Sequence, residues 1–118
     1  MPKCSGGRHT PAFVLLFLAE KPSYGLELQN KIDAVLAKNT IDCAAIYRTL
    51  KNLENTGMVK SSWDTSEAGP AKKYYSITEK GLKKLTEFNE DIQSRITNLR
   101  FFIQKYQTLQ NSGGENHE

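Results

Sequence analysis

Apolar side chains recur every three or four residues through the last third of the chain, and this spacing restricts the folds open to it. The series begins at Leu82 and ends at Tyr106. A near-heptad spacing is typical of a long helix that buries one face against another helix. A helix from Glu79 to about Thr108 would be about 45 Å long, which is more than a domain of this size can cover. We therefore predict a homodimer with a dimerisation helix over residues 79–110. The predicted interface residues are Leu85, Phe88, Ile92, Ile96, Leu99, Ile103 and Tyr106.

The charge of the chain is unevenly distributed. Its 118 residues carry a net charge of +3, and a chain of this length forms one domain with at most an appended element. Residues 1–77 contain ten Lys and Arg against seven Asp and Glu, whereas residues 78–118 contain six of each kind. The positive excess therefore lies in the first two thirds, where it fits an anionic partner.

The first apolar run of the chain predicts a core helix and not a membrane segment. Ala12–Ala19 is shorter than the roughly 20 residues that span a bilayer, and the residues after it lack a small-residue cleavage site. The two cysteines, Cys4 and Cys43, do not form a disulfide framework. We therefore expect a cytoplasmic protein without a membrane partner.

Residues 1–36 predict a mobile arm and then two helices. Residues 1–9 are rich in Gly, Ser and Lys and are expected to be mobile. Thr10 followed by Pro11 predicts the start of a helix that is apolar nearly all round and therefore central to the core. Ser23 is expected to cap a second helix that ends at Asn39. The apolar stripe of this second helix contains Leu28, Ile32, Val35 and Leu36.

A third helix and a hairpin are predicted to follow. Asp42 can cap a helix that runs to about Thr56 and ends at Gly57 in a left-handed turn. Two helices joined by a short turn form a helix-turn-helix unit. Residues 58–63 and 72–77 then alternate as two short strands around a Gly/Pro-containing loop. Trp63 is expected in the core, and the alternative is that it floors a small pocket against the dimerisation helix. A hairpin in this position is a wing.

The predicted fold class is mainly α with a small β-hairpin. A winged helix-turn-helix DNA-binding domain covers residues 10–78, with Thr78 as the cap of the long dimerisation helix. Residues 111–118 are expected to form a disordered tail because they are polar and contain two glycines.

The third helix has one apolar and one polar face. At about 100° per residue, Ile46, Leu50 and Leu53 point inward. The residues predicted to contact DNA lie on the outward face and its flank, and they are Ala44, Tyr47, Arg48, Lys51, Asn52 and Asn55. Arg can bind guanine, Asn can bind adenine, and Lys can bind phosphate. The alternative interpretation is an ordinary solvated helix face.

The hairpin adds two lysines to this candidate surface. Lys72 and Lys73 follow Gly69-Pro70, where they could reach phosphates or the minor groove. Lysines also occur on edge strands because they block aggregation. The position of the third helix, between a turn and a basic hairpin, favours the DNA-binding interpretation.

No pattern in the sequence points to catalysis, a cofactor or a metal. There is no Ser/His/Asp set, no acid pair on a rigid element and no glycine loop that could cradle a phosphate, so we do not expect an enzyme. Cys43 is predicted to be a buried, inert thiol near the inward edge of the third helix, with a redox role as the alternative. Cys4 and His9 are too few to form a metal site.

Four blocks of residues 12 to about 85, in order, resemble the PadR family of transcriptional regulators. After the opening apolar helix, residues 21–28 (KPSYGLEL) are similar to the family pattern P-x-Y/H-G-Y-E-L. Residues 46–54 (IYRTLKNLE) are similar to L-Y-P-A-L-K-R-L-E. Residues 69–78 (GPAKKYYSIT) are similar to the start of G-P-x-R-K-Y-Y-x-L-T-x-x-G. Four blocks at the expected spacing make the resemblance specific, whereas any one alone is weak.

The resemblance implies a winged-helix repressor that dimerises through its C-terminal helix and is often released from DNA by a small molecule. It assigns Tyr47 and Lys51 to recognition-helix contacts and Lys72 and Lys73 to the basic wing. The single C-terminal helix resembles the compact branch of the family. Arg48 stands where the family usually has Pro, and residues 40–44 (TIDCA) replace its small-Pro-Gly entry to the third helix, so the mode of base recognition is expected to differ.

We therefore expect a homodimeric repressor that binds double-stranded DNA at a palindromic operator and responds to a small-molecule effector. Two alternatives remain open. One is a winged-helix module that binds protein instead of DNA. The other is a thiol- or metal-responsive regulator that uses Cys43 or Cys4.

Overall fold

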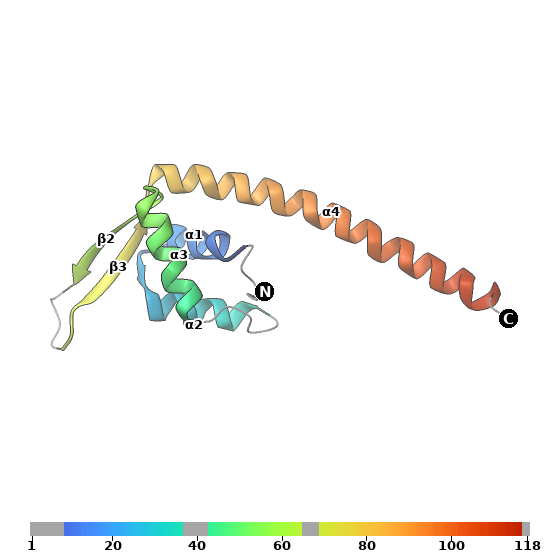
Figure 1. Ribbon diagram of the computed structural model, residues 1–118, viewed down its shortest axis with the longest axis horizontal. Helices are drawn as coiled ribbons and strands as arrows, with labels where there is room; N and C mark the ends of the chain where they lie inside the picture. The colour runs from blue at the N-terminus through green and yellow to red at the C-terminus, as the bar shows by residue number, and fades with distance from the viewer. Residues whose placement is uncertain (1–8, 37–42, 65–68, 117–118) are drawn as a thin grey trace. The chain divides into compact units, whose positions relative to one another are not determined.

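The computed structural model describes residues 9–36, 43–64 and 69–116 (Figure 1). The chain divides into two compact units, Met1–Thr86 and Glu87–Glu118. In chain order the elements are α1 (Thr10–Glu20), β1 (Ser23–Tyr24), α2 (Gly25–Val35), α3 (Cys43–Asn55), β2 (Val59–Asp64), β3 (Lys72–Ile77) and α4 (Glu79–Asn116). This confirms the predicted class of a mainly helical protein with a small hairpin and a long C-terminal helix.

The core of the first unit is built around α1, as its apolar sequence predicts. Val14 and Leu15 are fully buried and Leu18 is nearly so. They pack against α3, α2 and β3, and α3 lies across the helical core with one end beside β2 (Figure 1). Each fully buried side chain of this size contributes about 1.5–3 kcal/mol. The remaining core residues are Ala12, Leu28, Ile32, Ile46, Leu50, Leu53, Val59 and Tyr75.

The boundaries of α1 and α2 differ from the predicted ones. Thr10 is the first residue of α1 and not its cap, which is His9. Ser23 does not cap α2, because it is buried in the short strand β1, where its hydroxyl donates a hydrogen bond to the carbonyl of Lys21 (3.3 Å). Pairing with β3 holds Ser23 and Tyr24 extended, so α2 begins only at Gly25. It ends at Val35, and the predicted stop at residue 39 and the cap at residue 42 lie outside the described residues.

The sheet has one strand more than the predicted hairpin. Its order is β1-β3-β2 and both pairings are antiparallel. In the hairpin, Val59 pairs with Ile77 at the base and Asp64 pairs with Lys72 near the tip. The added strand β1 has two residues, which is too few for the alternation of side chains that marks a strand in a sequence.

The end of α3 follows the prediction closely. Gly57 adopts a left-handed conformation with φ of 81°. Its N–H donates to the carbonyl of Glu54 (3.1 Å), and the N–H of Met58 donates to the carbonyl of Leu53 (2.9 Å). This pair of bonds is the Schellman arrangement, which satisfies carbonyls that the helix end would otherwise leave unpaired. The turn leads directly from α3 into β2.

Thr78 joins the wing to α4, as predicted. Its hydroxyl accepts a hydrogen bond from the N–H of Gly81 (3.2 Å) and donates one to the carbonyl of Gly57 (2.7 Å). A side-chain bond from the N-cap to the third helical residue is the usual N-terminal cap. Gly81 lies so close to the turn that a Cβ atom there would collide with the carbonyl oxygen of Met58 and lie 2.7 Å from Cγ1 of Ile77. The start of α4 is therefore packed tightly against the turn after α3.

The long helix α4 extends beyond the predicted end at residue 110. It contains 38 residues and continues to Asn116, so the expected disordered tail over residues 111–118 is wrong for residues 111–116. Adding a residue to an existing helix costs far less than starting one, and the polar composition of this segment does not stop the helix. At about 1.5 Å per residue the helix is roughly 57 Å long.

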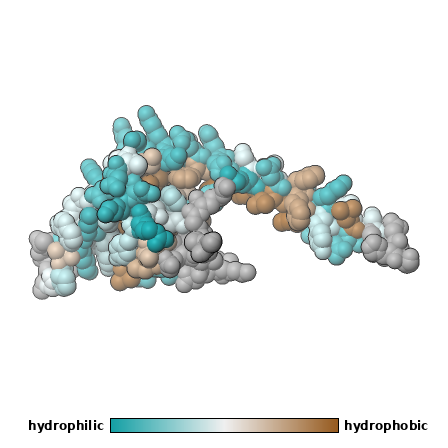
Figure 2. All heavy atoms as spheres, viewed as in Figure 1, coloured by the Kyte–Doolittle hydropathy of each residue, from teal (hydrophilic) through white to brown (hydrophobic). Residues whose placement is uncertain are grey.

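The second unit exposes most of its apolar residues. Leu99 is 63% exposed, and Ile103 and Tyr106 are each 53% exposed. Apolar residues gather along one side of the C-terminal half of α4 (Figure 2). The rings of Phe102 and Tyr106 stack with their centroids 6.4 Å apart. Among the described residues, none of the helices is both long enough and apolar enough to cross a membrane.

Candidate nucleic-acid interface

Helix α3 separates apolar from polar side chains as the sequence predicts. Ile46 and Leu50 are fully buried and Leu53 is 6% exposed. The six residues predicted to contact DNA are all exposed, and they are Ala44, Tyr47, Arg48, Lys51, Asn52 and Asn55. Because three apolar side chains anchor the helix from behind, the polar face is presented to solvent on a rigid element.

Tyr47 is held in place by the start of α2. Its ring lies directly against Gly25, where an added Cβ atom would come within 2.6 Å of the phenolic oxygen. Burial raises the pKa of Tyr47, with smaller contributions from Cys43 and Tyr75. The phenol therefore stays protonated at neutral pH and can donate a hydrogen bond to an anion. A side chain at position 25 would displace this ring.

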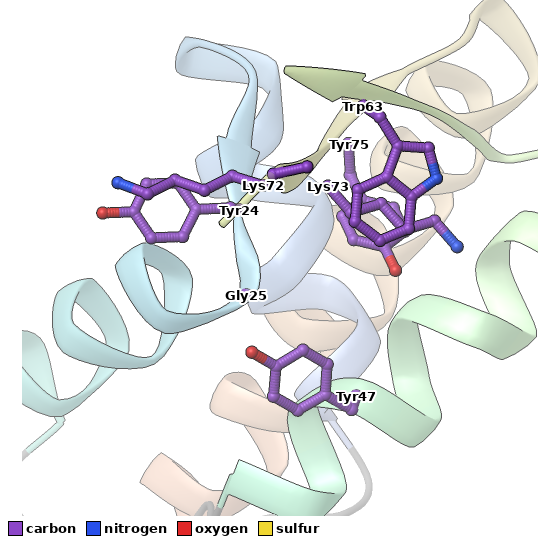
Figure 3. A pocket seen from close by; sticks show the side chains of 8 residues that line it. Tyr24, Gly25, Tyr47, Trp63, Lys72, Lys73 and Tyr75 are labelled. Carbon is purple, nitrogen blue, oxygen red and sulfur yellow. The ribbon is translucent and has the colours of Figure 1, made fainter. Parts of the chain in front are cut away.

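A pocket of about 490 Å³ lies where the start of α2, α3 and the wing meet (Figure 3). None of the described residues that line it is acidic, and two are lysines. The ammonium of Lys72 lies 4.7 Å from the ring centroid of Tyr24, which meets the ring of Tyr74 edge to face. The lining residues are Tyr24, Gly25, Tyr47, Trp63, Ala71, Lys72, Lys73 and Tyr75.

Trp63 is not a core residue, contrary to the prediction. It is 63% exposed on β2 and lines the pocket beside Lys73 and Tyr75 (Figure 3). Val59 and Trp63 lie on the same face of β2, since they are four residues apart, but only Val59, at the base of the hairpin, is buried. Trp63 lies at the distal end, where there is no core to receive it. The sequence alone did not show how far the hairpin extends beyond the helices.

Lys73 is arranged differently from its neighbour. Its ammonium lies 3.6 Å from Oε1 of Glu54 on α3, and the other carboxylate oxygen of Glu54 accepts a hydrogen bond from the hydroxyl of Ser61 (2.5 Å). Ser61 lowers the pKa of Glu54, and the positive charge of Lys73 lowers it further. Adjacent residues of a strand point to opposite sides, which sends Lys72 toward Tyr24 and Lys73 toward α3.

Cys43 is exposed, contrary to the predicted buried thiol. It occupies the first position of α3, one turn before the buried Ile46. Within residues 9–36, 43–64 and 69–116, no three His, Cys, Asp or Glu side chains are grouped as metal ligands. Cys4 lies outside the described residues.

Sequence reasoning missed Tyr24, Gly25, Trp63, Glu54 and Ser61 as parts of this surface. The first two belong to the KPSYGLEL block, whose resemblance to a family pattern was the available signal. Glu54 joins α3 to Ser61 and Lys73 of the hairpin, and Trp63 lies near Lys73 of the opposite strand. Such contacts depend on how the hairpin packs, and a periodicity within one element does not report them.

Comparison with known proteins agrees with this architecture. A curated relative, the probable transcriptional regulator Rv1176c of Mycobacterium tuberculosis, is 32% identical over 79 residues. The match covers 66% of this chain but only 42% of that protein, so the chain spans less than half the length of this relative.

Solved structures share the fold. The conserved protein TM0937, described as a potential transcriptional factor, is 30% identical with a TM-score of 0.70, and the match covers 92% of this chain and 99% of that one. A PadR-like transcriptional regulator from Bacillus cereus is 26% identical with a TM-score of 0.72, covering 82% of this chain and 93% of that one. The sequence model of the PadR-like transcriptional regulator family matches residues 14–87. The chain thus belongs to the PadR-like family, whose members are transcriptional regulators and not enzymes.

Proposed function

We propose that the protein is a homodimeric repressor that binds double-stranded DNA through α3 and the wing. The observation that carries this proposal is the outward face of α3, where an arginine, a lysine and two asparagines are exposed while the opposite face is anchored in the core. A rigid helix with this set of donors suits the major groove. Membership in a family of transcriptional regulators supports the same role.

The side chains divide by chemistry into base and phosphate contacts. Arg48 can form two hydrogen bonds with guanine, and Asn52 and Asn55 can do so with adenine. Lys51 and Lys72 carry single charges suited to phosphates. Ala44 leaves room for close approach of the helix, and the neutral phenol of Tyr47 adds a phosphate donor beside it. Lys73 extends the positive charge of the wing.

The apolar stripe of α4 supports the dimer. Leu99, Ile103 and Tyr106 are each more than half exposed, and a second copy of the same helix offers a matching stripe. Two α3 helices related by twofold symmetry bind a palindromic site with half-sites about 34 Å apart, one turn of DNA. Such a dimer represses by occluding the promoter, and a small-molecule effector that alters its geometry would release it.

Fluorescence anisotropy with duplex DNA from upstream of the protein's own gene, measured across salt concentrations, tests this function. We expect binding tighter than to scrambled duplex, with log K falling by about 0.9 per log unit of salt for each phosphate contact. Lys51→Ala should reduce this slope by about 0.9 per protomer.

Lys105→Ala, which removes the same charge from α4, is the matched control and should leave the slope unchanged. If no preferred duplex emerged even from a random-sequence selection, the DNA-binding function would be wrong and a protein-binding module would be favoured. If Lys51→Ala kept the parent slope, the assignment of α3 would be wrong.

A further inference from the structure

The two wing lysines are adjacent in sequence but have different surroundings. Lys72 is exposed, and its ammonium lies over the ring of Tyr24 at the rim of the pocket. The side chain of Lys73 is 34% exposed and reaches back to Glu54 on α3 (Figure 3 shows the two lysine side chains diverging). If both lysines bound DNA phosphates, Lys73 would first have to leave the carboxylate.

Lys73 belongs to a connected group that joins the wing to α3. Glu54 accepts a hydrogen bond from Ser61 on β2 through one oxygen and pairs with Lys73 on β3 through the other. A single carboxylate of α3 thus contacts both strands of the hairpin. The ammonium of Lys73 also lies 5.5 Å from the ring centroid of Tyr75 and 5.9 Å from that of Trp63, distances at which a cation is attracted to an aromatic face.

The charge of Glu54 is favoured by these contacts, since the Ser61 hydroxyl and the Lys73 ammonium both lower the pKa of its carboxyl group. The carboxylate is therefore ionised at neutral pH and available to both strands. A carboxylate that accepts a charge-assisted hydrogen bond from one strand and forms an ion pair with the other favours one position of the hairpin relative to α3.

We propose that Lys73 is a positioning residue and not a phosphate contact: together with Glu54 and Ser61 it fixes the wing against α3, so that Lys72 and the outward face of α3 meet DNA in one geometry. We call Glu54, Ser61 and Lys73 the wing clamp. This inference rests on the proposed DNA-binding function and assigns separate roles to the two wing lysines within it.

Substitution of Glu54 distinguishes a positioning role of Lys73 from a phosphate-binding role, because the two roles predict different changes in DNA affinity. If the wing clamp positions the wing, Glu54→Gln weakens DNA binding about twofold to fivefold, as expected from loss of a partly exposed ion pair. If Lys73 instead binds phosphate, Glu54→Gln removes a competing anion and leaves binding unchanged or tighter. Glu54→Gln that binds as tightly as the parent or more tightly would overturn the proposal.

The salt dependence of binding provides a second criterion on the full-length protein. Lys73→Gln should weaken binding by the same factor as Glu54→Gln without changing the salt slope, and the double variant should be no weaker than either single variant. Lys72→Gln is the matched control, and it should reduce the slope by about 0.9 per protomer. If Lys73→Gln reduced the salt slope as much as Lys72→Gln does, the proposal would be overturned. Ser61→Ala removes no charge, yet it should also weaken binding.

The motion of the wing can be measured without DNA. Trp63 is the single tryptophan of the chain and lies on β2 near Lys73. Its fluorescence anisotropy should fall in Glu54→Gln, Lys73→Gln and Ser61→Ala, and should stay at the parent value in Lys72→Gln, with circular dichroism confirming that each variant is folded. Unchanged anisotropy in all variants would overturn the wing clamp.

Failure of the parent to bind any duplex would instead refute the DNA-binding function, whereas the Trp63 measurement would still decide whether these residues hold the wing.

Discussion

Helices α3 and α4 are both amphipathic, but among the described residues the apolar face of α3 is buried and the apolar stripe of α4 is exposed. Ile46 and Leu50 of α3 are fully buried in the core of the first unit, whereas Leu99 of α4 is 63% exposed. The same periodic pattern thus produces a buried face in one helix and an exposed stripe in the other. A periodic apolar pattern predicts that one face of a helix packs against a partner. The surrounding fold decides whether that partner lies in the same chain.

The contrast extends to the function of each region. In the first unit, the buried face of α3 holds its polar face in a set position, which suits the proposed contact with DNA. In α4, the stripe that remains exposed is itself the candidate interface with a second copy. Large exposed apolar patches are rare on monomeric proteins and usually mark an interaction surface. The first unit therefore buries a core of its own, whereas the apolar stripe of the second unit is exposed and is the surface that the proposed dimer would cover.

The same Leu→Ala substitution should act differently in the two regions. Leu50→Ala creates a cavity in the core of the first unit and should lower the free energy of unfolding by about 2–5 kcal/mol, independent of protein concentration. Leu99→Ala should lower stability in a concentration-dependent way, since its contacts in the proposed dimer form between subunits. Urea denaturation at several protein concentrations checks both. Equal and concentration-independent effects would mean that Leu99 packs within its own chain.

A charge on the α4 stripe should separate the subunits and leave the first unit folded. Leu99→Asp would bury an unpaired carboxylate in the interface, so the mass in solution should fall from twice 13.3 kDa to 13.3 kDa. Affinity for a palindromic duplex should drop about 100-fold or more, because the second half-site no longer binds cooperatively.

Ser94→Asp, which adds the same charge on the other side of α4, should leave the mass in solution and the affinity for the duplex unchanged. Light scattering after size-exclusion chromatography measures the mass. A parent protein that runs at 13.3 kDa under conditions of tight DNA binding would contradict the dimer.

Acid should release the wing clamp with a small effect on the rest of the fold. The pKa of Glu54 is lowered from the ordinary value of 4.5, so the folded state binds this proton less readily than the unfolded chain. The contribution of Glu54 to stability is therefore fully present above about pH 4.5 and is lost as pH falls through its lower, folded-state pKa. The fluorescence of Trp63, followed against pH, should show a transition below pH 4.5 that Glu54→Gln lacks. A transition that is identical in Glu54→Gln would assign it to another group.

Local patterns predicted much of the fold and one face of the site. The spacing of Ile46, Leu50 and Leu53 correctly divides α3, and Gly57 and Thr78 correctly mark a helix end and a helix start. These features depend on neighbours within a few residues, which the sequence displays directly. The end of α4 was missed because polar residues and glycines weaken a helix without stopping one that is already formed.

The remaining features depend on contacts between segments far apart in the chain. Pairing with β3 made Ser23 a strand residue, and the reach of the hairpin beyond the core left Trp63 exposed. The sequence by itself determined where the helices lie along the chain and which face of α3 is apolar, because periodicity and capping are local. Only the tertiary structure decided which partners the two wing lysines meet, Tyr24 for Lys72 and Glu54 for Lys73, because the packing of β1 and α3 against the hairpin supplies them.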